Sequence, residues 1–147
     1  MIDYPDNFTR DELLYSETAE KLDVENVVEC RTHELNLLTL AHWLQRLRDK
    51  LGEEFEREVT IIVSSGYRCP KLNREVGGVD DSYHLLGLAA DIKASGLTAR
   101  ELAQFIKRHF VDFEEVIDEY GRWVHVALPC YEREAIAKIK NKGYVKI

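Results

Sequence analysis

The stretch from residue 64 to residue 92 constrains the fold more than any other part of this sequence. It is interrupted by four glycines, at Gly66, Gly77, Gly78 and Gly87. Glycine is unfavourable inside helices and strands and marks turns, so this stretch must consist of short elements joined by loops. Two of its side chains can take part in chemistry: His84, and Asp91 seven residues later in the apolar run LAADI.

Short elements can be placed around these glycines. The β-branched run at residues 58–64 predicts a central strand, and residues 88–94 predict a second strand on which Asp91 occupies one face. Pro70 is well placed to begin a short helix that runs to about residue 76. The loop that follows, at residues 79–87, is expected to contain one helical turn near His84.

Helices outside this stretch are predicted over residues 16–22, 34–51 and 99–110, and the second of them shows apolar residues recurring at three and four. Two capping boxes mark helix starts: Thr9 with Glu12 begins a further short helix, and Thr98 with Glu101 begins the last of those three. Gly52 is expected to end the long helix.

A hairpin is predicted near the end of the chain. Its strands, over residues 116–120 and 123–128, are expected to join through Gly121 and Arg122, because glycine can open a type II′ turn. Beyond the hairpin, the pattern predicts a helix and an edge strand, over residues 133–140 and 144–147.

We expect one α+β domain, with a small antiparallel sheet packed by helices. A chain of 147 residues can bury a core without disulfide or metal staples. Within residues 1–147, we expect residues 1–56 to form a helical N-terminal part and residues 57–147 to form the sheet, its helices and the functional site.

Composition excludes several classes of function. A formal net charge of −7 argues against a nucleic-acid partner bound through a general basic surface. The three cysteines form no CxxC pair, so neither a disulfide framework nor a cysteine-rich metal site is predicted. No leader or membrane-spanning run is found, which predicts synthesis in the cytoplasm and no membrane partner. Nothing indicates an obligate dimer, so a monomer is expected.

Three side chains could share a metal ion: His84, Asp91 and His125. Each has a simpler explanation alone, since buried histidines commonly bond to backbone and a buried aspartate can pair with arginine. Together, two imidazoles and one carboxylate suit Zn²⁺ with one position left open for water. Iron is the competing metal, but its usual His-x-Asp spacing is absent.

A carboxylate near the metal is needed to accept a proton from an attacking water. The candidates are Asp118 and Glu119, just before the predicted hairpin turn. A two-residue turn would pair Asp118 with His125, whereas a three-residue turn would pair Glu119 with it. The sequence leaves this register open.

Three motifs occur in order along the chain: SSGYRCPKLNREVGG, SYHLLGLAADI and VIDEYGRWVHVAL. Together they resemble the zinc D-Ala-D-Ala carboxypeptidases and peptidoglycan endopeptidases, a group that shares its fold with the hedgehog signalling domain. This group includes phage endolysins. The likeness is strongest to its small single-domain branch, found in phages and bacteria, and it extends to the FTRDEL opening.

The resemblance implies roles for particular residues. The zinc ligands would be the three residues already singled out, His84, Asp91 and His125. Arg68 matches an arginine that holds the substrate carbonyl or its oxyanion. Ser82 matches a serine near polar groups of the substrate, although a loop-capping hydroxyl is an equal alternative. Glu119 matches the acidic residue that this branch carries before W-x-H, so the resemblance favours it as the general base.

The resemblance implies zinc-dependent hydrolysis of an amide bond in peptidoglycan stem peptides, with the enzyme reaching the wall after release. One departure stands against it: better-known members carry the catalytic acid three residues before the last histidine, and Arg122 occupies that position here. The alternatives are a zinc-stabilised wall-binding module without turnover and a phage structural component.

Overall fold

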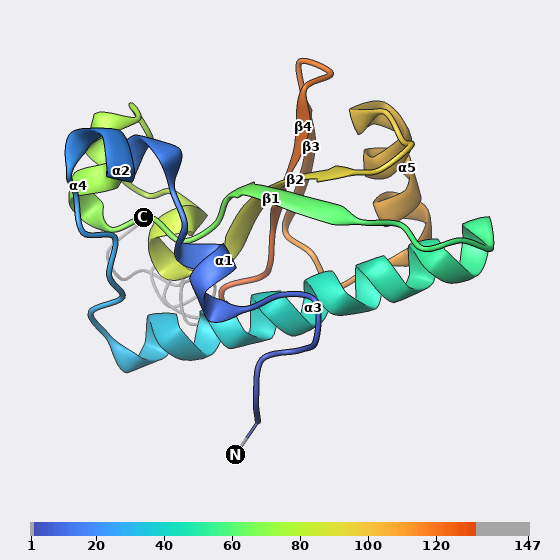
Figure 1. Cartoon of the computed structure of the whole chain (residues 1–147), viewed down its shortest axis with the longest axis horizontal. Helices are drawn as coiled ribbons and strands as arrows, with labels where there is room; N and C mark the ends of the chain where they lie inside the picture. Colours follow the sequence, from blue (N-terminus) through green and yellow to red (C-terminus); the bar gives the residue numbers. More distant parts are fainter. Residues whose placement is uncertain (1, 132–147) are drawn as a thin grey trace, which may run out of the picture.

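The computed structural model of the chain describes residues 2–131. Its centre is one antiparallel sheet with strand order β1-β2-β4-β3. The strands are short, and they span Ile61–Ser65 (β1), Ala89–Ala94 (β2), Glu115–Glu119 (β3) and Trp123–Ala127 (β4). Helices surround this sheet, so the α+β class with a small antiparallel sheet is confirmed (Figure 1).

The helices pack around the sheet in different places. The longest, α3 (Arg31–Phe55), runs along the molecule on the side away from the tip of the β3–β4 hairpin (Figure 1). The helix α5 (Ala99–His109) packs against β2, β3 and β4, and α1 (Arg10–Leu14) packs against α3 and β1. The short helices α2 (Glu17–Leu22) and α4 (Pro70–Glu75) gather at one end, and η1 (Tyr83–Leu86) contacts α3 and β2.

The core lies between α3, the sheet and α5. The apolar stripe of α3 is almost fully buried, and it consists of Leu37, Leu40, Ala41, Trp43, Leu44, Leu47 and Leu51. Each of its leucines stabilises the fold by roughly 1.5–3 kcal/mol through burial alone. Ile92, Val124 and Val126 meet this core from the sheet with no exposed surface. The opposite face of these strands is therefore free to carry polar side chains.

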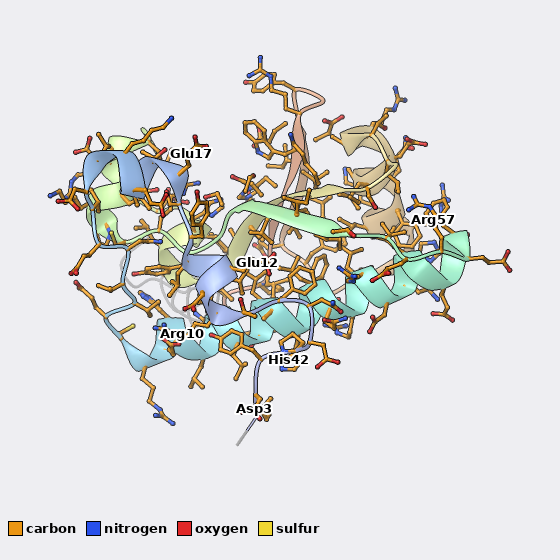
Figure 2. All side chains as sticks on the ribbon, in the orientation of Figure 1. Asp3, Arg10, Glu12, Glu17, His42 and Arg57 are labelled. Atoms are coloured by element: carbon orange, nitrogen blue, oxygen red, sulfur yellow. The ribbon has the colours of Figure 1, made fainter. Side chains whose placement is uncertain are left out.

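Polar contacts fasten the N-terminal segment to α3, and Figure 2 labels three of the residues involved, Asp3, Arg10 and His42. The His42 Nε2 lies 2.7 Å from the backbone oxygen of Asp3, and Arg10 forms an ion pair with Glu34. These contacts fix the position of α1, whose N-cap is the Thr9 hydroxyl accepting from the Glu12 amide.

The long helix α3 extends further than its periodicity predicted, and Gly52 does not end it. The helix continues to Phe55, and Glu56 takes the left-handed conformation with φ of 52°. The Arg57 amide then donates to the Gly52 carbonyl at 3.3 Å. The C-terminal cap is thus formed by a non-glycine residue, which a rule based on glycine misses.

The strand β1 lies at an edge of the sheet, so the prediction of a central strand is wrong. Its only strand neighbour among the described residues is β2, and its burial alternates from Ile61, which is buried, to Ile62, which is 57% exposed. A β-branched run indicates a strand but does not fix its neighbours, because those depend on the order of distant segments.

The hairpin connection has three residues rather than two. Tyr120, Gly121 and Arg122 separate the strands, with φ of 56° at Tyr120 and 71° at Gly121. The resulting register pairs Glu119 with Trp123 and Ile117 with His125. Neither acidic residue stands directly opposite His125, so both predicted pairings are wrong.

The remaining predicted elements are confirmed within a residue or two of their bounds. They include α2, α4, α5 with its complete capping box, β2, and the helical turn at His84, which is η1. The helix and strand predicted at residues 133–140 and 144–147 lie outside the described residues. Within residues 2–131, no helix is long and apolar enough to span a membrane.

Candidate metal centre

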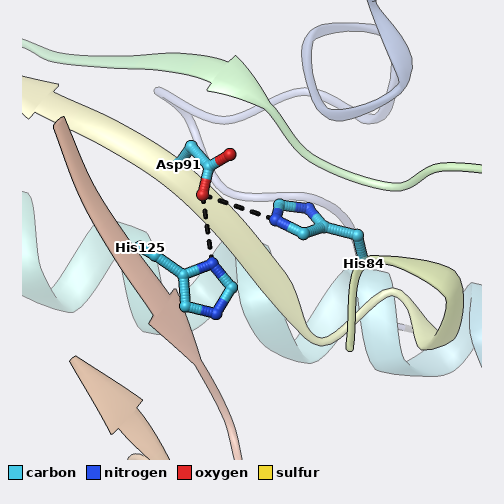
Figure 3. Close-up of side chains that lie close together, drawn as sticks. All are labelled: His84, Asp91 and His125. Carbon is cyan, nitrogen blue, oxygen red and sulfur yellow. Dashed lines mark hydrogen bonds and ion pairs between the residues drawn. The ribbon is translucent and has the colours of Figure 1, made fainter. Parts of the chain in front are cut away.

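Three elements bring His84, Asp91 and His125 together (Figure 3). His84 belongs to η1, Asp91 to the middle of β2, and His125 to the neighbouring strand β4 directly opposite Asp91. The Asp91 Oδ1 lies 3.4 Å from the His84 Nε2 and 3.1 Å from the His125 Nδ1. The three residues predicted from the sequence therefore lie together in the structure, although His84 and His125 are 41 positions apart in the chain.

The backbone of residues 65–68, the SGYR loop at the end of β1, orients His84. The His84 Nδ1–H donates to the Gly66 carbonyl at 2.7 Å, and the Arg68 amide donates to the His84 carbonyl at 3.0 Å. The Ser82 hydroxyl accepts from the His84 amide, so Ser82 caps η1, as one of its two predicted roles required. With its side chain only 2% exposed, His84 has its Nε2 fixed toward Asp91.

Gly66 is required because another backbone segment lies against it. A Cβ at this position would come within 2.3 Å of the Leu13 carbonyl oxygen. The same oxygen accepts a hydrogen bond from the Tyr67 amide at 2.9 Å. The loop is thus held between α1 and His84, which explains why a glycine must follow β1.

Asp91 is paired with histidines rather than with an arginine. Burial raises the pKa of Asp91, but interactions with the His125 and His84 rings outweigh that effect and hold the pKa well below its ordinary value. The buried carboxylate is therefore ionised at neutral pH and available as a ligand. The simple explanation of an Asp–Arg ion pair does not apply, because Arg68 interacts with Asp91 only through longer-range charge.

His125 has a carboxylate at each ring nitrogen. Its Nδ1 faces Asp91, and its Nε2 lies 3.3 Å from the Glu115 Oε1. Burial lowers the pKa of His125, but Asp91 and Glu115 together raise it above its ordinary value. The simple explanation, a neutral ring bonded to backbone, is therefore replaced by contacts to two acids.

The cluster fits a bound metal ion. One donor atom from each of the three residues lies within 4.8 Å of the other two. Among the described residues, the His84 Nε2 is a buried nitrogen without a hydrogen-bond partner, and it points at the cluster. Such an orphan is costly unless something else occupies its lone pair. Two imidazole nitrogens and one carboxylate oxygen suit Zn²⁺.

Arg68 is held beside the cluster by a buried amide. Its Nη1 donates to the Asn73 Oδ1 at 3.0 Å, while the Asn73 amide group donates to the Val79 carbonyl at 2.9 Å. Burial lowers the pKa of Arg68, and the nearby Asp91 charge opposes that shift. Arg68, Asp91 and Trp123 line one pocket, so the guanidinium is placed to meet a ligand there.

The two candidate bases lie on opposite faces of β3. Asp118 pairs with Val124, which is fully buried on the other face, and its Oδ1 accepts from the Gly121 amide in the hairpin turn. Glu119 shares a face with His125 and lines a pocket with His125 and Ser82. The geometry removes Asp118 and leaves Glu119 as the base candidate of the two.

Glu115 is a site residue that the sequence reasoning missed. It lies on the same face of β3 as Glu119 and contacts His125. In the sequence it is one of several acidic residues in the run FEEVIDE, and nothing there distinguishes it from the others. The usable signal was the alternation of Glu115, Ile117 and Glu119, since every second residue of a strand shares a face. That signal becomes informative only once the hairpin register is known.

Comparison with known proteins agrees with this geometry. A family model described as peptidase M15 matches residues 6–127. The chain is also similar to a zinc D-Ala-D-Ala carboxypeptidase of Streptomyces albus G, at 32% identity over 90 residues. That match covers 61% of this chain and 32% of the relative, so the chain corresponds to about a third of the relative's length. The family resemblance seen in the sequence motifs is confirmed: the chain belongs to the peptidase M15 family.

Proposed function

We propose that this protein is a zinc-dependent peptidase that hydrolyses an amide bond in peptidoglycan stem peptides. One observation carries the proposal: two histidines and an aspartate converge on one point, and the buried His84 Nε2, which has no hydrogen-bond partner, is aimed at it. Membership of the peptidase M15 family and the name of the Streptomyces relative support the reaction and the substrate class.

The metal is zinc, and His84, Asp91 and His125 would hold it through Nε2, Oδ1 and Nδ1. When bound, zinc polarises a substrate carbonyl and makes water acidic enough to attack it near neutral pH. The chain's contribution is to keep these three donors fixed and partly shielded, since the exposed fractions of their side chains are only 2%, 13% and 14%.

Glu119 is proposed as the general base. It is the acidic residue that the family resemblance favours, and it lies on the same face of the sheet as His125 and lines a pocket with that residue. A carboxylate there can accept the proton of the attacking water and return it to the leaving amine.

Arg68 and Ser82 are proposed to meet the substrate from two different pockets, each of which includes one residue of the cluster. Arg68 lines the pocket that includes Asp91, and its fixed positive charge would stabilise the oxyanion that develops on the substrate carbonyl. Ser82 lines the pocket that includes His125, where its hydroxyl would contact polar groups of the peptide. Its cap on η1 is compatible with this second role, because a hydroxyl oxygen has two lone pairs.

Which amide bond is cut, and in which biological role, is also a proposal. The name of the relative supports a bond next to D-alanine, cleaved either at a C-terminal residue or within a cross-link. The likeness of its motifs to the branch of phages and bacteria supports an endolysin-like role in cell-wall degradation.

A second candidate is a zinc-stabilised wall-binding module without turnover. It is favoured by Arg122, which stands three residues before His125 where better-known members carry the catalytic acid. Arg122 lies exposed in the hairpin connection, so no carboxylate reaches the cluster from that position.

The substitution Glu119→Gln separates the two candidates. It keeps the side-chain shape but removes the basic oxygen, so we expect zinc content near wild type and a fall in hydrolysis of at least about 100-fold. Asp118→Asn is the matched control, because it makes the same chemical change on the opposite face and should keep its activity. Full activity in Glu119→Gln with zinc bound would refute Glu119 as the base.

A further inference from the structure

We propose that Glu115 is a positioning residue for the metal centre: it fixes the His125 ring so that Nδ1 faces the metal. This inference rests on the proposed metal site but not on turnover. It assigns separate roles to two carboxylates of one strand, Glu115 and Glu119.

The contacts of His125 define the geometry. Its Nδ1 lies 3.1 Å from the Asp91 Oδ1, on the cluster side of the ring, and its Nε2 lies 3.3 Å from the Glu115 Oε1, on the far side (Figure 3 shows the ring and Asp91). Glu115 reaches this position because Ile117 is the direct partner of His125 and residues two apart on a strand share a face.

The chemistry of imidazole explains why this contact matters. A neutral ring carries one proton, and a ring that binds a metal through Nδ1 must carry it on Nε2. A carboxylate that accepts the Nε2–H selects that tautomer, holds the ring plane and makes the ligand nitrogen more basic. Without an acceptor, the ring could turn or carry its proton on Nδ1, where it would block the metal.

The same arrangement recurs at the other histidine with the nitrogens exchanged. The His84 Nδ1–H donates to the Gly66 carbonyl at 2.7 Å, which leaves Nε2 for the metal. Each imidazole of the cluster therefore has an acceptor on its outer nitrogen. One acceptor is backbone and cannot be removed by substitution, whereas the other is the Glu115 side chain.

Exposure sets the expected size of the effect. The Glu115 side chain is 43% exposed, so water can partly replace it, while the His125 side chain is only 14% exposed. Removal of an outer acceptor usually weakens metal binding by about 10-fold to 100-fold, and this exposure places Glu115 near the lower value.

The test is zinc affinity, measured on the purified full-length chain by competition with a chelator of known affinity. We expect Glu115→Ala to bind zinc about 10-fold more weakly than wild type. Glu115→Gln should stay within about threefold, because its amide oxygen can still accept the Nε2–H. Glu114→Ala is the matched control: it removes one exposed negative charge from the adjacent position, and its zinc affinity should remain near that of wild type.

Each outcome decides the inference. Equal weakening in Glu115→Ala and Glu114→Ala would reduce the effect to general charge and overturn the proposal. Glu115→Gln as weak as Glu115→Ala would overturn the hydrogen-bond explanation. Glu115→Gln that keeps zinc but loses hydrolysis would make Glu115 the base instead of a positioning residue. Failure of the wild-type chain to bind zinc would refute the proposed metal site itself, which is a distinguishable result.

A ring-specific readout complements affinity. In zinc-loaded wild type, the ¹⁵N resonances of His125 should show a protonated Nε2 and an unprotonated Nδ1, and this pattern should persist in Glu115→Gln. Broadened or averaged His125 resonances are expected in Glu115→Ala. An unchanged His125 pattern in Glu115→Ala would overturn the proposal even if the protein were less stable.

Discussion

At the scale of single residues, Gly66 links the packing of the N-terminal helix to the metal centre. The Leu13 carbonyl oxygen lies against the backbone of Gly66, and the Gly66 carbonyl oxygen accepts the Nδ1–H of His84. A side chain at this position would therefore move the loop away from α1, from His84, or from both. The stability of the fold and the orientation of His84 therefore both depend on the absence of a Cβ at Gly66.

We predict that Gly66→Ala lowers the free energy of unfolding by about 1–3 kcal/mol, the usual cost of overpacking. The physical reason is the 2.3 Å approach of the new Cβ to the Leu13 carbonyl oxygen. Chemical denaturation of the zinc-free protein measures this directly.

Gly52→Ala is the control for Gly66→Ala. Gly52 lies inside α3, where alanine is favoured over glycine by about 0.5–1 kcal/mol, and its new Cβ would lie 3.3 Å from the Arg57 carbonyl oxygen. Its loss of unfolding free energy should be smaller than that of Gly66→Ala, because the new Cβ is 3.3 Å rather than 2.3 Å from the nearest carbonyl oxygen. A larger loss in Gly52→Ala than in Gly66→Ala would contradict the account of the loop.

At the scale of elements, Asp112 ties the segment after α5 to the side of α3. Its carboxylate accepts from the Trp43 Nε1 at 3.1 Å and from the Arg46 Nη2 at 2.8 Å. Partial burial raises the pKa of Asp112, but the hydrogen bonds from Arg46 and Trp43 outweigh it and lower the pKa overall. The charged form is thus the one that stabilises the fold.

We predict that Asp112→Ala lowers stability by about 1 kcal/mol at pH 7, an amount kept small because the pair is largely exposed. A lowered folded-state pKa stabilises the protein above the unfolded-state pKa, and this contribution is lost as the pH falls through the folded value. The difference between wild type and Asp112→Ala should therefore shrink below about pH 4. Denaturation at pH 7 and pH 3 measures it, and a difference that grew in acid would contradict the assignment.

Local patterns predicted most elements correctly and missed features set by tertiary contacts. The capping pair Thr98 and Glu101 and the glycines of the 64–92 stretch act over a few residues, so α5 and η1 could be located from the sequence. The position of β1 at the edge depends on strand order. The hairpin register depends on Tyr120, which takes a positive φ that its side chain does not predict.

The residues of the candidate site also differ in whether the sequence alone could predict them. His84, Asp91 and His125 could be found because each polar side chain stands out in an apolar or glycine-framed segment. Glu115 could not, because its contact with His125 requires the three-residue connection, and a shift of one residue would place it on the other face.

At the scale of the whole molecule, the metal centre adds a further link between η1 and two strands, β2 and β4, that are already hydrogen-bonded to each other. The cluster links η1 to β2 and β4, so a bound ion would hold the loop after α4 against the sheet. Binding to the folded state alone would then raise global stability.

We predict that zinc raises the melting temperature and that a chelator reverses the rise. At free zinc 100 times its dissociation constant, the gain is about 2.7 kcal/mol. His84→Ala should abolish most of this gain, whereas His42→Ala, a histidine on α3 bonded to Asp3, should keep it. Thermal unfolding followed by circular dichroism measures both, and an equal gain in both variants would contradict the metal site.

Digestion of isolated peptidoglycan by the purified protein, with soluble products identified by mass spectrometry, tests whether the protein is a peptidase. We expect new stem-peptide fragments that disappear with a zinc chelator, return when Zn²⁺ is restored and are absent with Glu119→Gln. Their masses would identify the bond that is cut. Zinc-loaded protein that binds several wall types and releases no fragment from any of them would contradict the peptidase account and favour the binding module.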